Sequence, residues 1–113
     1  MDTNSQKMSL QITKVLQTKT HINQVDIADV ADTLGTSTSL ISLKLKQENT
    51  SFYSLKQNVL ISCAIKYLLN TDYPAMTISE VLGYSEPKAF SRAFKRWTGL
   101  SPIAYRRVNL EEG

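Results

Sequence analysis

Cysteine and histidine, which often bind metals or take part in nucleophilic catalysis, are nearly absent from this sequence of 113 residues. Cys63 and His21 are the only residues of either kind. A single cysteine cannot form an internal disulfide, and Cys63 lies in the apolar run LISCAIKYLL, where we expect a small buried side chain. The remaining polar residues show no spacing typical of a metal centre or a catalytic triad. We therefore expect no enzyme, no metal ion and no cofactor.

Long apolar segments and glycine-rich loops are also lacking. No stretch approaches the roughly 18 uncharged apolar residues that a membrane-spanning helix needs. The N-terminal residues MDTNSQKM lack the basic and apolar regions of a signal peptide. Phosphate-binding glycine motifs do not occur. These absences, with a lone cysteine suited to a reducing compartment, predict a cytoplasmic protein that has no membrane partner.

Glycine and proline are few, four and three residues, and they fall between segments of helical periodicity. No segment alternates convincingly between apolar and polar residues as a strand would. We therefore predict an all-α fold of seven helices. The expected helices are Ser9–Thr18, Asp26–Leu34 with Gly35 as C-cap, one capped by Ser37, Phe52–Asn70, one from Pro74 to Gly83, one from a Ser85 cap to Gly99, and one beginning at Ser101 and Pro102.

Apolar positions within these segments predict the core. They recur at spacings that bring them to one face of each helix. The residues expected to be buried are Leu10, Ile12, Val15, Leu16, Ile27, Val30, Ala31, Leu34, Leu40, Ile41, Leu45, Met76, Ile78, Val81, Leu82, Phe90, Phe94, Trp97, Ile103, Tyr105 and Val108.

The second half of the chain repeats the first. The matching pairs are VADTLG at 30–35 with ISEVLG at 78–83, ISLKLK at 41–46 with FSRAFK at 90–95, and Asn49 with Gly99. Their offsets are 48, 49 and 50 residues, so the copies differ by single residues in their turns. Each copy places two helices around a tight turn, which is typical of a helix-turn-helix. The sequence thus predicts a duplicated helix-turn-helix.

A long helix separates the two copies. We expect a first subdomain at residues 1–50, a connecting helix at 51–70 and a second subdomain at 71–113. At about 1.5 Å per residue the segment Phe52–Asn70 would span about 28 Å. Two helices that read successive major grooves of double-stranded DNA must lie about 34 Å apart. A connector of this length, together with the width of the flanking turns, could hold that spacing within a single chain. We therefore expect a monomer that binds an asymmetric site across two grooves.

Positive charge is concentrated in the second copy. The net charge is only +3, and residues 1–50 carry five lysines and five acidic residues. Residues 83–107 carry six cations, including all four arginines, against the single acid Glu86. A basic cluster alone is also typical of a solvated surface, so it needs a motif beside it to indicate nucleic-acid binding.

The segment FSRAFKRWTGLSP supplies that motif. Helical spacing places its three aromatic residues on one side and its cations on the others. We expect Lys88, Ser91 and Arg92 to enter a major groove, while Lys95 and Arg96 approach phosphates. The alternative for Arg92 is a surface ion pair with Glu86 or another carboxylate.

At these residues the sequence resembles the AraC/XylS family of bacterial transcription regulators. The stretch LGYSEPKAFSRAFKRWTGLSPIAYRR resembles the family signature without a gap. DVADTLGTSTSLISLKLKQENTSF is similar to the family's first helix-turn-helix, so the resemblance covers about residues 8–107. It implies seven helices, two helix-turn-helix subdomains joined by the fourth helix, and sequence-specific DNA binding that regulates transcription.

The resemblance also implies base-contacting residues in both copies. In the second copy these are Pro87, Lys88, Ser91 and Arg92, and in the first they are Ser39, Ser42 and Leu43. Lys44 and Lys46 are candidates for phosphate contacts, with ordinary solvated lysines as the alternative.

Two positions depart from the family pattern. Leu43 stands where the family usually has arginine, and it can touch a thymine methyl but cannot hydrogen-bond a base edge. Asn49 replaces a usual glycine and tolerates a left-handed cap. We therefore expect most base-specific contacts to come from the second copy. Tyr105 resembles the family's packing tyrosine, a structural role.

Two other interpretations stay open. The chain could be the DNA-binding fragment of a larger effector-responsive regulator whose N-terminal part binds an effector or dimerises. RNA polymerase is a second candidate partner, and the chain is expected to bind DNA as a monomer unless a missing N-terminal domain dimerises it. A helical module that binds RNA or another protein is the alternative of a different class. Single-stranded RNA is usually bound by exposed aromatic residues, whereas the aromatic residues here are expected in the core.

Overall fold

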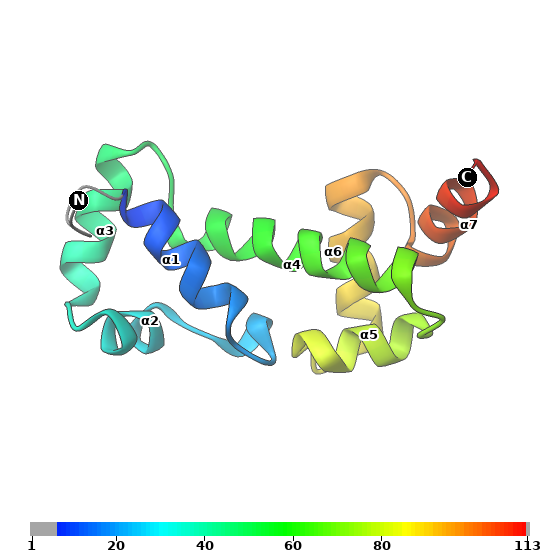
Figure 1. Ribbon diagram of the computed structural model, residues 1–113, viewed down its shortest axis with the longest axis horizontal. Coiled ribbons are helices and arrows are strands. Elements are labelled where there is room, and N and C mark those ends of the chain that lie inside the picture. The colour runs from blue at the N-terminus through cyan, green and yellow to red at the C-terminus, as the bar shows by residue number, and fades with distance from the viewer. Residues whose placement is uncertain (1–6, 113) are drawn as a thin grey trace. The chain divides into compact units, whose positions relative to one another are not determined.

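The computed structural model describes residues 7–112, with side chains up to Leu110. Within this range the chain forms seven α-helices and no strand, as the sequence predicts (Figure 1). The helices are α1 (Met8–Gln17), α2 (Ile27–Leu34), α3 (Thr38–Gln47), α4 (Phe52–Asn70), α5 (Ala75–Leu82), α6 (Pro87–Thr98) and α7 (Pro102–Glu112). A short 3-10 turn at Ile22–Gln24, which the sequence did not predict, precedes α2.

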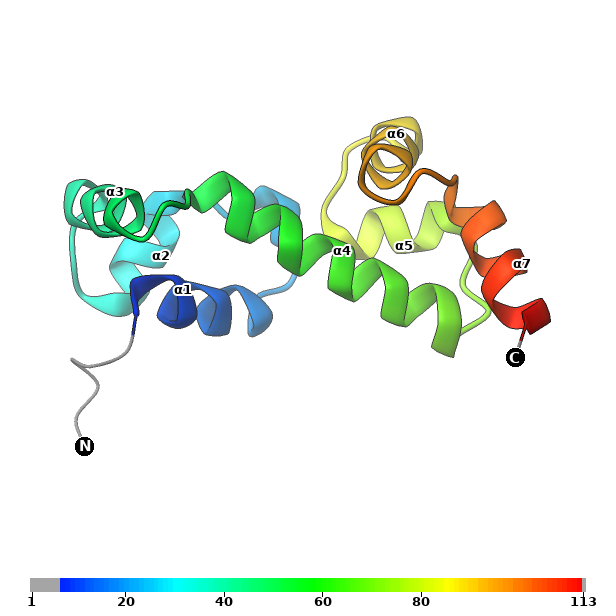
Figure 2. The same ribbon diagram turned by 90° about the horizontal axis from the view of Figure 1, so that it is seen from above.

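The helices pack into two units, one ending at Val59 and the other beginning at Leu60. The boundary lies within α4, so each unit includes part of that helix. In the first unit α1 packs against both α2 and α3, and in the second α6 packs against α5 and α7. Figure 2 shows each group from above. Each unit therefore contains one helix-turn-helix motif, α2–α3 or α5–α6.

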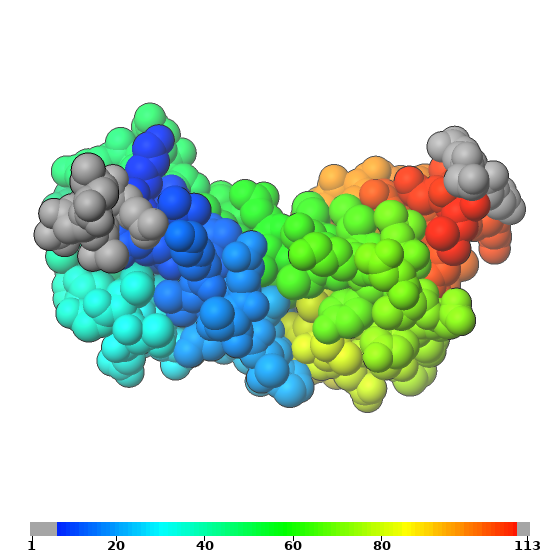
Figure 3. All heavy atoms as spheres, in the orientation of Figure 1, coloured from blue at the N-terminus to red at the C-terminus, as the bar shows by residue number. Residues whose placement is uncertain are grey.

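The core of the first unit is aliphatic. Ile12 and Leu16 of α1, Val30 of α2, and Ile41 and Leu45 of α3 are almost completely buried. These positions were predicted from helical spacing, and they are confirmed. In Figure 3, α1 (blue) covers much of the visible face of this unit.

The core of the second unit is built around an aromatic cluster. Phe90 and Phe94 of α6 are fully buried, with ring centroids 5.9 Å apart. The ring of Tyr105 in α7 packs edge-on against that of Phe94, with the ring centroids 5.3 Å apart. The ring of Trp97 also packs edge-on against Phe94, with a centroid distance of 6.2 Å, and Trp97 is half-buried. The prediction that the aromatic side of α6 packs onto its own unit is confirmed, and so is the packing role of Tyr105.

The two motifs contain the same turn. Gly35 and Gly83 follow the first helix of each motif and adopt left-handed φ values of 68° and 93°. In each case the next N–H donates back across the helix end, from Thr36 to the Ala31 carbonyl and from Tyr84 to the Ser79 carbonyl, both at 3.0 Å. Glycine adopts this conformation without the steric strain that a side chain would cause. The repeat seen in the sequence is therefore a repeat of backbone geometry.

The ends of α3 and α6 largely agree with the sequence. Ser37 caps α3 by accepting a hydrogen bond from the Leu40 N–H at 3.1 Å. After α3, Asn49 adopts the left-handed conformation expected of it, with φ 61°, and the equivalent Gly99 has φ 85°. These residues end both helices before the chain turns toward the next one.

The expected cap of α6 at Ser85 is wrong. The helix begins one residue later, with Glu86 as N-cap and Pro87 in the first turn. A residue before proline is driven into extended backbone by contact with the pyrrolidine ring, and Glu86 has φ −139° and ψ 136°. The start of α6 is instead linked to α5 by Ser79, whose buried hydroxyl donates to the Glu86 carbonyl at 3.5 Å.

Several apolar residues predicted in the core are exposed instead. They are Leu10, Leu40, Met76, Val81, Ile103 and Val108. Leu10 lies on the side of α1 away from the buried Ile12, Val15 and Leu16. Units this small cover only a narrow stripe of each helix. Cys63 is half-buried rather than buried, and desolvation raises the pKa of its thiol while Lys66 opposes that effect.

Candidate nucleic-acid interface

The exposed face of α3 carries the residues predicted to contact bases in the first unit. Ser39, Ser42 and Leu43 are all exposed. At about 100° per residue, Leu43 lies opposite the midpoint between Ile41 and Leu45, the two residues that anchor α3 in the core. Leu43 is therefore the most outward-pointing position of the helix.

The exposed face of α6 has the same construction. Pro87, Lys88 and Arg92 are exposed and Ser91 is half-buried. Arg92 lies opposite the midpoint between Phe90 and Phe94, just as Leu43 lies opposite its buried pair. The offset of 49 residues therefore makes Leu43 and Arg92 equivalent positions in the two motifs.

The two helices differ in charge. Helix α6 contains four cations and no acid, and all four are exposed: Lys88, Arg92, Lys95 and Arg96. Helix α3 carries only Lys44 and Lys46, both exposed and both in its last turn. Among the described side chains no ion pair joins Arg92 to Glu86, the alternative considered for that arginine. The α6 cations are thus available to an anion.

Glu48 links the end of α3 to the start of α1. Its carboxylate accepts hydrogen bonds from the backbone N–H groups of Met8, at 2.8 Å, and Ser9, at 3.3 Å. Hydrogen bonds from the Ser9 side chain and from these N–H groups lower the pKa of Glu48 against the opposing effect of desolvation. This contact fixes α3 against the first helix of its own unit.

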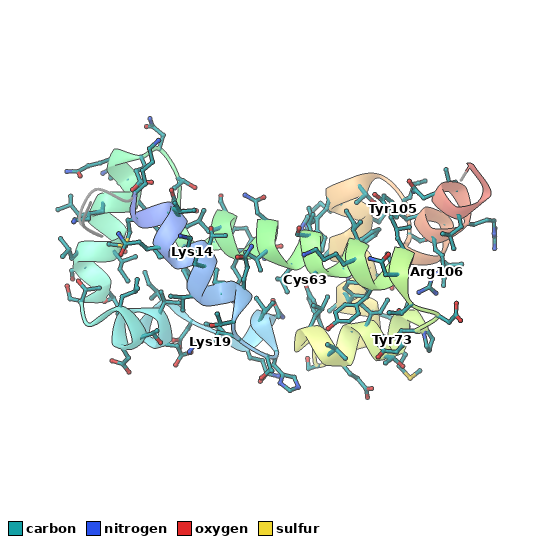
Figure 4. All side chains as sticks on the ribbon, in the orientation of Figure 1. Lys14, Lys19, Cys63, Tyr73, Tyr105 and Arg106 are labelled. Carbon is teal, nitrogen blue, oxygen red and sulfur yellow. The ribbon has the colours of Figure 1, made fainter. Side chains whose placement is uncertain are left out.

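Arg106 is a cation with a structural role. It belongs to the basic cluster along the chain, but its guanidinium donates to three backbone carbonyls: Leu68 at 2.8 Å, Thr71 at 3.2 Å and Tyr73 at 2.7 Å. Figure 4 shows Arg106 on α7 near Tyr73, where α4 connects to α5. Arg106 therefore holds the segment that leads into the second motif, and three of its five N–H donors are already used there.

Lys56 makes the equivalent contact in the first unit. Its ammonium donates to the Asn23 and Val25 carbonyls, both at 3.0 Å, in the segment that leads into α2. These carbonyls lie 48 residues before those of Thr71 and Tyr73, the same offset as the turns. Desolvation lowers the pKa of Lys56, and Asp26 opposes that effect. The repeat itself was the signal that could have assigned Arg106 to this structural role.

Metal-holding clusters and membrane-spanning helices are absent over the described part of the chain. No three histidine, cysteine, aspartate or glutamate side chains lie close enough to hold a metal ion there. None of the described helices has both the length and the apolar character required to cross a bilayer.

Comparison with protein families and known sequences supports the motif assignment. A family model described as a helix-turn-helix domain matches residues 30–108. An uncharacterised HTH-type transcriptional regulator of Mycobacterium bovis is 37% identical over 79 residues, which cover 70% of this chain and 23% of that protein. The arabinose operon regulatory protein of Salmonella typhimurium is 35% identical over 82 residues, 72% of this chain and 29% of that protein. The chain thus spans about a quarter of the length of these relatives.

Solved structures share the fold. The C-terminal domain of AraT, a response regulator from Geobacillus stearothermophilus, is 31% identical with a TM-score of 0.79, over 91% of this chain and 86% of that one. The DNA-binding domain of AdpA, crystallised with a target DNA, has a TM-score of 0.72 at 19% identity, over 92% of this chain and 93% of that one. At that identity the second likeness concerns the fold alone.

Proposed function

Because this chain belongs to the AraC/XylS family of helix-turn-helix proteins, we propose that it binds double-stranded DNA sequence-specifically and thereby regulates transcription. In this proposal α3 and α6 enter two successive major grooves of one duplex. The activity is binding, and it requires no cofactor.

The observation that carries the proposal is the equivalence of the two exposed helix faces. Leu43 and Arg92 are each held outward by a buried pair on the opposite side of the helix, after the same glycine turn. A helix anchored in this way presents a fixed row of side chains, as reading of base edges requires. Phe90 and Phe94 are buried, so neither ring is free to stack on a base, which disfavours RNA binding by α6.

The proposed roles follow from exposure and charge. Base contacts from α6 come from Pro87, Lys88, Ser91 and Arg92, and those from α3 come from Ser39, Ser42 and Leu43. Phosphate contacts come from Lys95, Arg96, Lys44 and Lys46. A guanidinium can bind guanine O6 and N7 in bidentate fashion, so Arg92 is the strongest single determinant of sequence in this proposal.

The proposal extends to the setting of the protein. The relatives are several times longer, so we infer that this domain works within a regulator whose other part binds an effector or dimerises. The proposed compartment is the cytoplasm. RNA polymerase is the second proposed partner. The isolated domain is expected to bind DNA as a monomer.

Alanine substitutions should separate base contacts from phosphate contacts. Arg92→Ala is expected to weaken binding to the preferred duplex by about 1 to 3 kcal/mol and to relax selectivity at one base pair. Lys95→Ala should weaken binding to all duplexes alike and lower the slope of log affinity against log salt by about one. Affinities for a preferred and a scrambled duplex at several salt concentrations would measure both effects.

Arg107→Ala is the matched control, because Arg107 is an exposed arginine of α7 outside the proposed interface. It should leave selectivity unchanged. Equal losses on preferred and scrambled DNA for Arg92→Ala would remove this residue from base reading. Tighter binding of single-stranded RNA than of any duplex DNA would contradict the proposed function itself.

A further inference from the structure

Helix α3 exposes two leucines on the face proposed to meet DNA. Leu43 is 53% exposed, and Leu40, which the sequence pattern placed in the core, is 40% exposed. Residues three apart are neighbours on a helix surface, so the two side chains form one apolar patch. The patch lies within the first two turns of α3, where the neighbouring residues Ser39 and Ser42 are small and uncharged.

This patch does not follow from the fold, because the second motif lacks it. The offset of 49 residues places Ala89 and Arg92 at the positions of Leu40 and Leu43. The second motif thus presents a small residue and a cation where the first presents two large apolar side chains. The units share a backbone design but offer different chemistry at the same place.

The major groove contains one apolar group that such a patch fits. In the major groove of unmodified DNA, thymine presents a methyl group at C5. The other groups that the base edges present there are hydrogen-bond donors and acceptors. Leucine side chains have neither donors nor acceptors, so they cannot satisfy polar edges and would desolvate them at a cost. Contact with a methyl, in contrast, removes apolar surface of both partners from water.

We propose that Leu40 and Leu43 read thymine methyl groups, so that the part of the site bound by α3 is selected chiefly by methyl contacts, with Ser39 and Ser42 in a lesser part. This inference rests on the proposed DNA binding and adds Leu40 to the specificity-determining residues. It makes recognition by α3 mainly apolar and recognition by α6 mainly hydrogen-bonded.

Replacement of thymidine by deoxyuridine tests the proposal, because it removes the methyl and keeps every hydrogen-bonding group. Each thymidine of the preferred duplex would be replaced in turn and the affinity measured. At one or two positions the wild-type protein should bind about fourfold more weakly, the value expected for one buried methyl-sized group. In the Leu43→Ala or Leu40→Ala variant, replacing thymidine by deoxyuridine at one of these positions should weaken binding by less than twofold.

Leu10→Ala is the matched control, because Leu10 is a leucine of α1 with a similar exposed fraction, 46%. This variant should keep the full sensitivity to deoxyuridine. The inference is overturned if wild type binds the preferred duplex and no deoxyuridine substitution weakens it, or if both leucine variants keep the wild-type sensitivity. Failure to prefer any duplex would instead overturn the proposed function, and the inference with it.

Discussion

Replacement of Phe94 by alanine is expected to lower the free energy of unfolding of the second unit by about 3 to 5 kcal/mol. Phe94 is fully buried, and its ring contacts those of Phe90, Trp97 and Tyr105. Removing it leaves a cavity at the point where α6 meets α7, and the surrounding rings cannot collapse fully to fill it. The orientation of α6 depends on this packing.

Chemical denaturation followed by tryptophan fluorescence would measure this effect. Trp97 is the only tryptophan in the chain and lies on α6, so its emission reports on the second unit. Ile103→Ala, which truncates an exposed side chain on α7, should change the stability by less than about 0.5 kcal/mol. A loss below about 1 kcal/mol for Phe94→Ala would show that the aromatic cluster does not hold α6.

Replacement of Arg106 by methionine should destabilise the second unit by about 2 to 3 kcal/mol, because three carbonyls lose a charged donor. Lys56→Met in the first unit should cost less, about 1 to 2 kcal/mol, because its ammonium donates to two carbonyls. Hydrogen exchange would follow the two units separately. We expect faster exchange at the start of α5 in Arg106→Met and at the start of α2 in Lys56→Met.

Arg106→Met also distinguishes a structural cation from a phosphate contact. Under conditions where the variant is folded, the salt dependence of DNA binding should equal that of wild type. Arg106→Lys should recover part of the stability, because an ammonium can donate to the same carbonyls in a less suitable geometry. Unchanged stability combined with a lower salt slope would mean that Arg106 binds phosphate, contrary to the structure.

Most of the fold was predictable because its boundaries are local. A glycine that follows an apolar helix face predicts a left-handed cap, and Gly35, Gly83 and Gly99 all adopt one. The limits of α4 were predicted to the residue. The start of α6 was missed because Ser85 is a good capping residue, whereas the extended backbone imposed by Pro87 moves the helix start past it.

Burial was predicted less well, because it depends on neighbours that are distant in sequence. Leu40 and Met76 have helical spacing suited to a core, but the small units leave both exposed. Counting charge along the chain places Arg106 in the basic cluster at residues 83–107 but gives it no role. Its acceptors lie 33 to 38 residues earlier, and only the tertiary structure brings them together.

The candidate interface was predictable in its positions, and its residues remain a prediction until DNA binding is measured. The internal repeat predicts that Leu43 and Arg92 occupy equivalent sites, and both side chains are exposed. What the sequence pattern obscured is the apolar character of α3, because its spacing assigns Leu40 to the core. That difference gives the two motifs unlike chemistry at equivalent positions.

Selection of bound duplexes from a random pool tests the central claim most directly. The affinity and stoichiometry of the preferred duplex would then be measured at two salt concentrations. The proposed function predicts one asymmetric motif that spans two successive major grooves and is bound by a single chain. The half contacted by α3 should contain thymine, and the half contacted by α6 should contain guanine. Binding without any selected motif, and lost entirely as salt is raised, would contradict sequence-specific recognition and leave only a nonspecific basic surface.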